Sequence, residues 1–155
     1  MPEVLQSNTL AKVLSSSKAA SALRAVVPRT DRALLKVSRG WLNVGLLSTA
    51  LIKTTGAKSG KAREITTHCM PAGHDLILVG SNWGRDFNPA WYHNMKAYPQ
   101  VRVTYRGFKG DMIATELKGK ERALMWERLI EFNPLYKQYE ANTERTLPVI
   151  QLRRV

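Results

Sequence analysis

The first forty residues place apolar and polar positions at the spacing of amphipathic helices. Apolar residues recur every three or four positions over residues 9–26, which predicts a helix that Pro28 ends, because proline lacks a backbone N–H. A second, short helix is predicted from a Thr30 cap to Gly40. Lysine and arginine occupy many of the polar positions of both helices. Residues 1–44 are therefore predicted to form a basic, amphipathic, helical N-terminal segment.

From residue 45 the pattern changes to short apolar runs separated by turn residues, as in a sheet. The predicted strands cover residues 46–53, 65–70, 76–80, 101–105, 112–116 and 148–152. A helix from Pro89 to Ala97 interrupts the series, and helices over residues 120–132 and 133–139 precede the last strand. This order favours an antiparallel α+β barrel over a parallel α/β sheet. Residues 45–155 are predicted to form that barrel as one domain.

The net charge of +12 is concentrated near the N-terminus. Residues 1–63 hold 11 Lys and Arg against 2 Asp and Glu, whereas the remaining residues hold 13 against 10. Such a field attracts nucleic acid, an anionic lipid surface or a phosphorylated small molecule. Before Trp83 the only aromatic residue is Trp41, and nucleic-acid modules usually interleave aromatic with basic residues. The charge pattern therefore disfavours specific nucleic-acid binding.

Several classes of chemistry have no support in the sequence. The single cysteine, Cys69, excludes an internal disulfide and suits a reducing, cytoplasmic setting. No run approaches the roughly 20 apolar residues of a membrane span, and no signal-peptide pattern opens the chain. Neither a Ser-His-Asp arrangement nor metal-ligand spacing is evident, so no metal site is predicted. If the protein is an enzyme, a cofactor must carry the difficult step.

One stretch, residues 54–63 and here called the basic loop, combines flexible backbone with many hydrogen-bond donors. Gly56 and Gly60 can adopt positive φ and turn backbone N–H groups inward, and Lys58, Lys61 and Arg63 add positive charge. A phosphate or carboxylate would suit this set. The spacing of the glycines does not match a P-loop. A solvated basic hairpin turn is an equally good interpretation of these ten residues alone.

Two later segments add candidate binding groups. Residues 88–94 begin the predicted helix beside a polar turn, so its N-terminus could bind an anion or a carbonyl group, and Trp91 could flank a flat ring. Tyr136 and Tyr139 share a helical face and could place phenols over a pocket. Packing in the core is the alternative for all three aromatic side chains.

Together, the three segments resemble the deazaflavin-dependent nitroreductase-like oxidoreductases of actinobacteria. The matching residues, in order, are Thr54, Thr55, Gly56, Lys58, Ser59, Gly60, Lys61, Arg63, Gly80, Ser81, Asn88, Pro89, Ala90, Trp91, Tyr92, Asn94, Tyr98, Pro99, Gln100, Val101, Trp126, Glu127, Pro134, Tyr136, Tyr139, Thr143, Arg145 and Pro148. They span about residues 45–152 at family spacing, and the ordered set is specific.

This resemblance implies a split β-barrel, an antiparallel six-stranded barrel of the FMN-binding type with flanking helices, that binds coenzyme F420. The implied cofactor residues are Ala57, Lys58, Ser59, Gly60, Lys61, Arg63, Glu64, Ile65, Thr66, Thr67, Gly80, Ser81, Asn82, Ala90, Trp91, Tyr92 and Asn94. Lys58, Ser59 and Arg63 would meet the phosphate, and the backbone of residues 64–67 would border the deazaflavin ring. The implied catalytic residues are Tyr136, Ser81 and Tyr139.

The implied reaction transfers a hydride from reduced F420 to a hydrophobic enone, quinone or nitroaromatic. FMN is the alternative cofactor, and a non-enzymatic module for anionic lipid or nucleic acid is the alternative function. Members of the family that reduce nitroimidazoles commonly have a basic residue at the position of Ala57 and Lys-Gly at the position of Asn82 and Trp83. These differences affect cofactor affinity and the pocket mouth, so reduction of nitro drugs does not follow. The basic N-terminal segment would allow peripheral contact with the inner face of the membrane.

Overall fold

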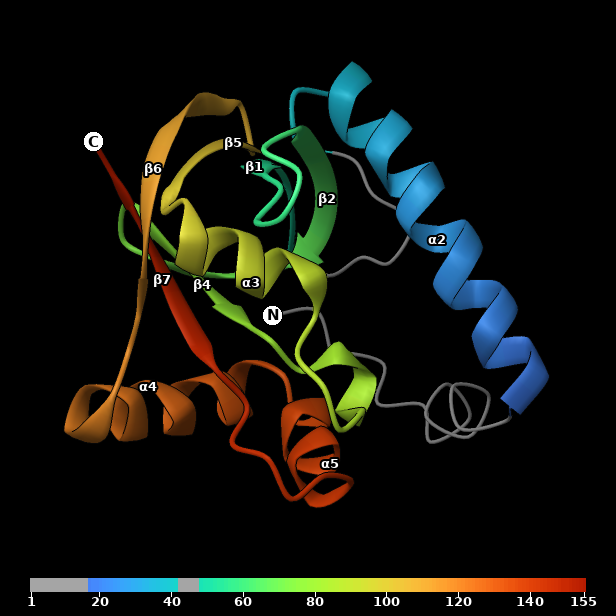
Figure 1. The fold of residues 1–155 in the computed structure, drawn as a ribbon, viewed down its shortest axis with the longest axis vertical. Coiled ribbons are helices and arrows are strands. Elements are labelled where there is room, and N and C mark those ends of the chain that lie inside the picture. The colour runs from blue at the N-terminus through green and yellow to red at the C-terminus, as the bar shows by residue number, and fades with distance from the viewer. Residues whose placement is uncertain (1–16, 42–47) are drawn as a thin grey trace, which may run out of the picture.

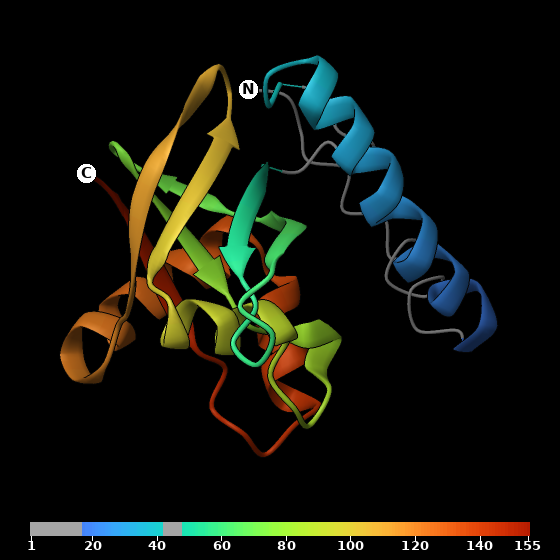
Figure 2. The same cartoon turned by 45° about the horizontal axis from the view of Figure 1, so that its top comes forward.

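The computed structural model describes residues 17–41 and 48–155, and its centre is one curled antiparallel sheet (Figures 1 and 2). Its strands are β1 (Thr49–Thr55), β2 (Ala62–His68), β3 (Met70–Ala72), β4 (Asp75–Val79), β5 (Gln100–Tyr105), β6 (Phe108–Glu116) and β7 (Val149–Arg154). They pair in the order β2-β1-β5-β6-β7-β4-β3. The sheet curls into a split barrel whose free edges are β2 and β3, so the predicted α+β split-barrel fold is confirmed.

Alternating side chains explain why these segments form strands with one face buried. In β5, Val101, Val103 and Tyr105 are buried and the residues between them are more exposed. They join Ile52 of β1 and Leu152 of β7 in the core inside the curl. Helix α3 (Ala90–Ala97) packs Tyr92 and Met95 into the same core. The inserted helix is thereby fixed against the inner face of the barrel.

A second core lies on the other face of β4 and β7. Leu76 and Leu78 point into the barrel, whereas Ile77 and Val79 point outward. Helices α4 (Gly119–Phe132) and α5 (Leu135–Ala141) cover this outer face with residues that include Trp126, Leu129 and Tyr136. Because β4 is buried on both faces from Leu76 to Val79, these four residues are continuously apolar rather than alternating.

The sheet has seven strands among the described residues rather than the predicted six. The predicted strand over residues 65–70 is two strands, since β2 ends at His68 and β3 begins at Met70. Between them the Cys69 N–H donates to the Ser48 carbonyl. The chain therefore changes partners at Cys69, and β2 pairs with β1 whereas β3 pairs with β4.

The N-terminal helix differs from the prediction. Helix α2 (Ser17–Val37) continues through Pro28, which was expected to end it. Proline removes one backbone hydrogen bond, but the Pro28 carbonyl accepts a hydrogen bond from Thr66 Oγ1 of β2 at 3.4 Å. Tertiary docking thus holds the helix across the proline. Residues 9–16 of the predicted first helix and the predicted domain boundary at residue 44 lie outside the described residues, and that boundary stays a prediction.

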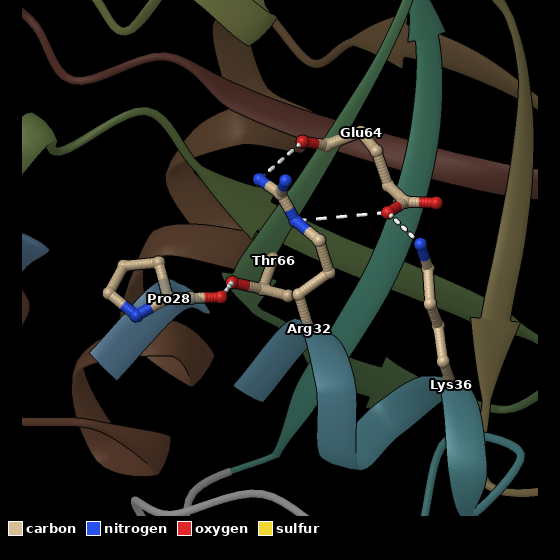
Figure 3. A network of polar contacts seen from close by, with 5 residues as sticks. All are labelled: Pro28, Arg32, Lys36, Glu64 and Thr66. Carbon is tan, nitrogen blue, oxygen red and sulfur yellow. Dashed lines mark hydrogen bonds and ion pairs between the residues drawn. The ribbon is translucent and has the colours of Figure 1, made fainter. Parts of the chain in front are cut away.

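Contacts with outward-facing residues of β2 attach α2 to the sheet (Figure 3). The Glu64 carboxylate lies 2.7 Å from Lys36 Nζ and 3.7 Å from Arg32 Nε. Arg32 also donates to the Glu64 backbone carbonyl at 3.0 Å. Helix α2 therefore covers the outer face of the β2 edge (Figure 2). Neither this helix nor any other in residues 17–41 and 48–155 is long and apolar enough to cross a membrane.

Candidate cofactor site

The basic loop forms the tip of the hairpin between β1 and β2. Thr55 pairs with Ala62, and between them the Gly56 N–H donates to the Lys61 carbonyl at 2.8 Å. The Gly60 N–H returns to the Gly56 carbonyl at 2.8 Å, with Gly60 at φ 64°. These bonds close a tight turn that needs glycine in the left-handed region. Of the predicted phosphate ligands, Arg63 lies on β2 and the others lie on the turn itself.

The cations of the basic loop are available to a ligand. Lys58, Lys61 and Arg63 are exposed, and none of them forms an ion pair within the part of the chain that the structure describes. Ser59 is also exposed, and its hydroxyl accepts a hydrogen bond from the Lys61 N–H at 3.3 Å. Three cations and a hydroxyl on one hairpin tip suit a phosphodiester or carboxylate tail.

Asn94 attaches the basic loop to helix α3. Its Oδ1 accepts a hydrogen bond from the Ala57 N–H at 2.9 Å, and its Nδ2 donates to Thr54 Oγ1 at 3.2 Å. Asn94 is 9% exposed; its bond to Thr54 is buried and its bond to Ala57 is partly buried. The first two predicted segments are thus joined by one buried side chain, and the position of the basic loop depends on α3.

The chain between β4 and α3, residues 80–88 and here called the Ser81 loop, has an unusual backbone. Asn82, Trp83 and Gly84 have φ of 45°, 61° and 75°, so three consecutive residues lie in the left-handed region. For a residue other than glycine this conformation costs about 1–2 kcal/mol. A Cβ on Gly84 would lie 3.1 Å from the Tyr139 carbonyl oxygen. Glycine is needed there both for its backbone and for the close approach of α5.

One guanidinium holds the Ser81 loop in place. Arg145 donates from Nη2 to the carbonyls of Gly80 at 3.0 Å and Ser81 at 2.8 Å. Its Nε donates to the Arg85 carbonyl at 2.7 Å, and its Nη1 donates to Asn88 Oδ1. Partial burial lowers the pKa of Arg145, and nearby Asp86 opposes that shift. Arg145 therefore fixes both ends of the loop that precedes α3.

The two tyrosines of α5 have different surroundings. Tyr136 is 4% exposed in the outer core, with its ring 6.3 Å from that of Trp126. Burial raises the pKa of the Tyr136 phenol, and a hydrogen bond with the Asn133 side chain partly opposes this. Tyr139 is half-buried and meets Trp83 edge-to-face, with ring centroids 6.3 Å apart. Tyr136 therefore lies in the outer core, and Tyr139 lies against the Ser81 loop.

Other predicted site residues direct their side chains elsewhere. The Glu64 and Thr66 side chains bond to α2, so on these two only the backbone of β2 is available to a ring. Ile65 and Trp91 pack against the inner core. The Tyr92 hydroxyl donates to the Glu116 carboxylate at 3.2 Å.

Remaining predicted residues lie near those described above. Thr67 is partly buried on β2, and Ala90 is exposed at the first position of α3. Asn82 Nδ2 donates to the Phe87 carbonyl at 3.0 Å, which braces the Ser81 loop internally. Arg145 was quoted among the matching residues but not predicted as a site residue. Its only signal in the sequence is its place between Thr143 and Pro148 among the residues that match the family.

The fold is an antiparallel split barrel with a basic, exposed hairpin tip, and comparisons with known proteins identify the family. The family model described as F420H(2)-dependent quinone reductase matches residues 24–153. An F420H(2)-dependent quinone reductase of Mycobacterium tuberculosis (strain H37Rv) is 31% identical over 107 residues, which cover 67% of this chain and 72% of the relative. The chain belongs to the F420H(2)-dependent quinone reductase family.

Solved structures agree with this assignment. The structure of an F420-H2 dependent reductase (FDR-A) is 35% identical, has a TM-score of 0.63, and covers 72% of this chain and 100% of its own. A structure described as a domain-swapped dimer is 32% identical with a TM-score of 0.66, over 86% of this chain and 98% of its own. The predicted oxidoreductase class, hydride transfer to quinone-type acceptors and coenzyme F420 are confirmed by the family.

Proposed function

We propose that this chain binds coenzyme F420 between the basic loop and the Ser81 loop and reduces a hydrophobic quinone there. The proposal rests on two side chains that each join segments distant in the sequence. Asn94 holds the basic loop to α3, and Arg145 holds the Ser81 loop to the segment after α5. The exposed cations therefore stand at a fixed distance from the loops that would surround the ring.

Each element has a proposed role. Lys58, Ser59 and Arg63 would bind the phosphodiester, and Lys61 would meet the glutamate tail. The backbone of residues 64–67 would border the ring, together with Ser81, Asn82 and the first turn of α3. Outward-facing side chains of β2 are held by α2, so this strand offers the ring a rigid edge. Helix α2 would keep bulk water from one side of the ring.

Reduced F420 supplies a hydride, and one proton from solvent or a protein hydroxyl completes the conversion of quinone to hydroquinone. We assign the proton to Ser81, Tyr136 or Tyr139. Burial raises the pKa of Tyr136 and keeps its phenol neutral, but Tyr136 is 4% exposed in the outer core, whereas Ser81 and Tyr139 are half-buried. If Tyr136 donates the proton, Tyr136→Phe would slow turnover without changing the dissociation constant for F420, measured by fluorescence. An unchanged rate would remove Tyr136 from this role.

Cofactor assignment is tested by fluorescence titration with oxidised F420 and with FMN at the same salt concentration. Saturable binding of F420 at micromolar concentration or below is expected, with FMN much weaker. Lys58→Ala and Arg63→Ala should each weaken F420 binding by about 1–3 kcal/mol, the range for a charge-assisted hydrogen bond. Their effect should shrink in high salt because the cations are exposed.

The matched control is Lys109→Ala, which removes the same charge from β6 near its turn with β5. This exposed residue pairs with Thr104, at the end of the sheet away from the basic loop. Its replacement should leave F420 affinity unchanged. If Lys58→Ala and Arg63→Ala also leave affinity unchanged, the phosphate assignment is wrong; preference for FMN would keep the fold and replace the cofactor.

We further propose that the enzyme is cytoplasmic and accepts nitroaromatics or enones as secondary substrates. We also propose that it contacts the membrane through α2. Val26, Val37 and Trp41 are 57%, 88% and 64% exposed beside the basic residues Arg29 and Arg39. Exposed apolar and basic groups on α2 and on the turn that follows it suit an anionic lipid surface. Co-sedimentation with vesicles containing phosphatidylglycerol should fall in Val37→Asp. Equal co-sedimentation of the variant would argue against this contact.

A further inference from the structure

A carboxylate lies on the inner face of the barrel at the end of β6. Met112 and Ala114 of this strand pack in the inner core, and Glu116 shares their face because side chains alternate along a strand. The Glu116 side chain is 20% exposed. An apolar residue would close this end of the core without the cost of removing a charge from water. Hydrophobic packing therefore does not account for Glu116.

Two residues of α3 contact this carboxylate. The Tyr92 hydroxyl donates to Glu116 Oε1 at 3.2 Å and lies 3.3 Å from Oε2, and Lys96 Nζ lies 3.4 Å from Oε2. Tyr92 and Lys96 are four residues apart and share one face of the helix. Tyr92 is a predicted cofactor residue, yet its hydroxyl is bonded to β6. Glu116 therefore attaches one face of α3 to the sheet.

Asn94 extends from the opposite face of the same helix. Two residues turn an α-helix by about 200°, so Asn94 points away from Tyr92 and toward the basic loop, where it bonds to Ala57 and Thr54. Helix α3 contacts both β6 and β1, and Figure 1 shows it between β6 and the β1–β2 hairpin. Packed helices shift as rigid units, so a change at Glu116 would be passed to Asn94.

We propose that Glu116 is a positioning residue for the cofactor, which sets the orientation of α3 and, through Asn94, the position of the basic loop. This inference rests on the proposed function, because it concerns F420 bound at that loop. In Glu116→Leu the Tyr92 hydroxyl loses its acceptor. The dissociation constant for F420, measured by fluorescence titration, should then rise about three- to tenfold.

The direction of the change separates positioning from a direct effect of charge. Because the cofactor tail is anionic, removal of a carboxylate would by itself strengthen binding. Glu116→Gln removes the same charge but retains an oxygen that can accept from Tyr92, so the dissociation constant should stay within about twofold of that of the unaltered protein. Tyr92→Phe keeps the charge and loses the bond, so it should weaken binding as Glu116→Leu does. Glu131→Leu, at an exposed position of α4, is the control and should change nothing.

A double-mutant cycle tests whether the effect passes through Asn94. In the Asn94→Ala background, Glu116→Leu should change the dissociation constant less than about twofold, because the link to the basic loop is already lost. The shift that Glu116→Leu causes in the urea unfolding midpoint should be the same in both backgrounds, as expected for residues without a shared contact. If Glu116→Leu does not fold, Tyr92→Phe takes its place in the cycle.

The outcomes distinguish this inference from the function on which it rests. Unchanged or tighter F420 binding in both Glu116→Leu and Tyr92→Phe would overturn the positioning role alone. An equal loss of affinity with and without Asn94 would also overturn it, because the effect would not pass through that side chain. Absence of F420 binding by the unaltered protein would overturn both proposals.

Discussion

The basic loop and the Ser81 loop are both fastened near α3, but they are built differently. The basic loop presents exposed cations on an ordinary hairpin turn, and a neutral buried amide, Asn94, holds it. The Ser81 loop presents an aromatic ring on a strained turn, and a charged guanidinium, Arg145, holds it. In each loop the group that is proposed to meet a ligand differs in kind from the group that holds the loop in position.

Because the loops differ in this way, we expect the basic loop to set affinity for the cofactor and the Ser81 loop to set selectivity for the acceptor. Exposed cations attract any anionic tail at long range and are screened by salt, so the basic loop suits a cofactor that carries charge. A fixed ring recognises shape at short range, so the Ser81 loop suits the selection of an uncharged acceptor. Variants at the two fixing residues can show whether the loops are independent.

The largest effect is expected from Arg145→Ala. Four acceptors on the Ser81 loop would lose their charged donor, and we expect the free energy of unfolding to fall by about 3 kcal/mol. Urea unfolding measures this loss. Binding of F420 should also weaken, while its dependence on salt concentration should stay the same because Lys58, Lys61 and Arg63 remain in place.

Two other variants control for loss of charge at Arg145. Arg145→Lys retains the positive charge but cannot make four directed bonds, so it should recover only a small part of the stability. Arg153→Ala removes an exposed arginine of β7 and should change stability little. Full recovery by lysine would show that charge, rather than the geometry of the guanidinium, holds the loop.

A smaller effect is expected from Asn94→Ala, which acts on the other loop. The Ala57 N–H and the Thr54 hydroxyl would lose their partner, and the resulting shift of the basic loop should weaken F420 binding by about 1–2 kcal/mol. Fluorescence titration measures the change. Selectivity between naphthoquinone and benzoquinone should be retained.

Asn94→Asp tests which atoms of the Asn94 side chain make the two hydrogen bonds. A carboxylate oxygen can still accept from the Ala57 N–H, and the Thr54 hydroxyl can turn to donate, so Asp should recover part of the affinity that Ala loses. If Asn94→Ala alters quinone selectivity as strongly as F420 affinity, the two loops are not independent and the comparison fails.

These two loops also differ in how far the sequence predicted them. The basic loop was visible because glycines and cations lie within ten residues, and its hairpin geometry follows from local rules. The strands were visible from alternation. Arg145 and the strained turn were not, because Arg145 reaches acceptors about sixty residues away along the chain. No local pattern reports such a contact.

Pro28 and Cys69 show the same limit in the fold. A proline rule predicted a helix end at Pro28, but contacts of Pro28, Arg32 and Lys36 with β2 hold α2 as one helix. Cys69 sits in a continuous β-like run, yet the sheet changes partners there. In both places long-range packing decided the outcome, whereas the sequence rules describe neighbours only.

The smallest effect is expected from pH, which should act through His68 of β2 and leave both loops unchanged. His68 of β2 contacts Thr49 Oγ1 at 3.1 Å. Burial lowers the pKa of His68 from its ordinary value of 6.5, and nearby Asp31 of α2 opposes the shift. Because the unfolded chain then binds the proton more readily, the free energy of unfolding should fall as pH decreases through 6.5, by about 1 kcal/mol between pH 7.5 and 5.5.

Urea unfolding of His68→Gln at these two pH values tests the assignment. Glutamine cannot take up the proton, so the fall should be smaller in this variant, whereas His93→Gln, at an exposed position of α3, should keep it. F420 affinity should not follow the same pH dependence, because the basic loop is held by the amide of Asn94. An equal fall in His68→Gln and the unaltered protein would assign the dependence to another group. Parallel loss of F420 affinity would instead show that protonation of His68 on β2 also affects the basic loop, and that this loop depends on more than Asn94.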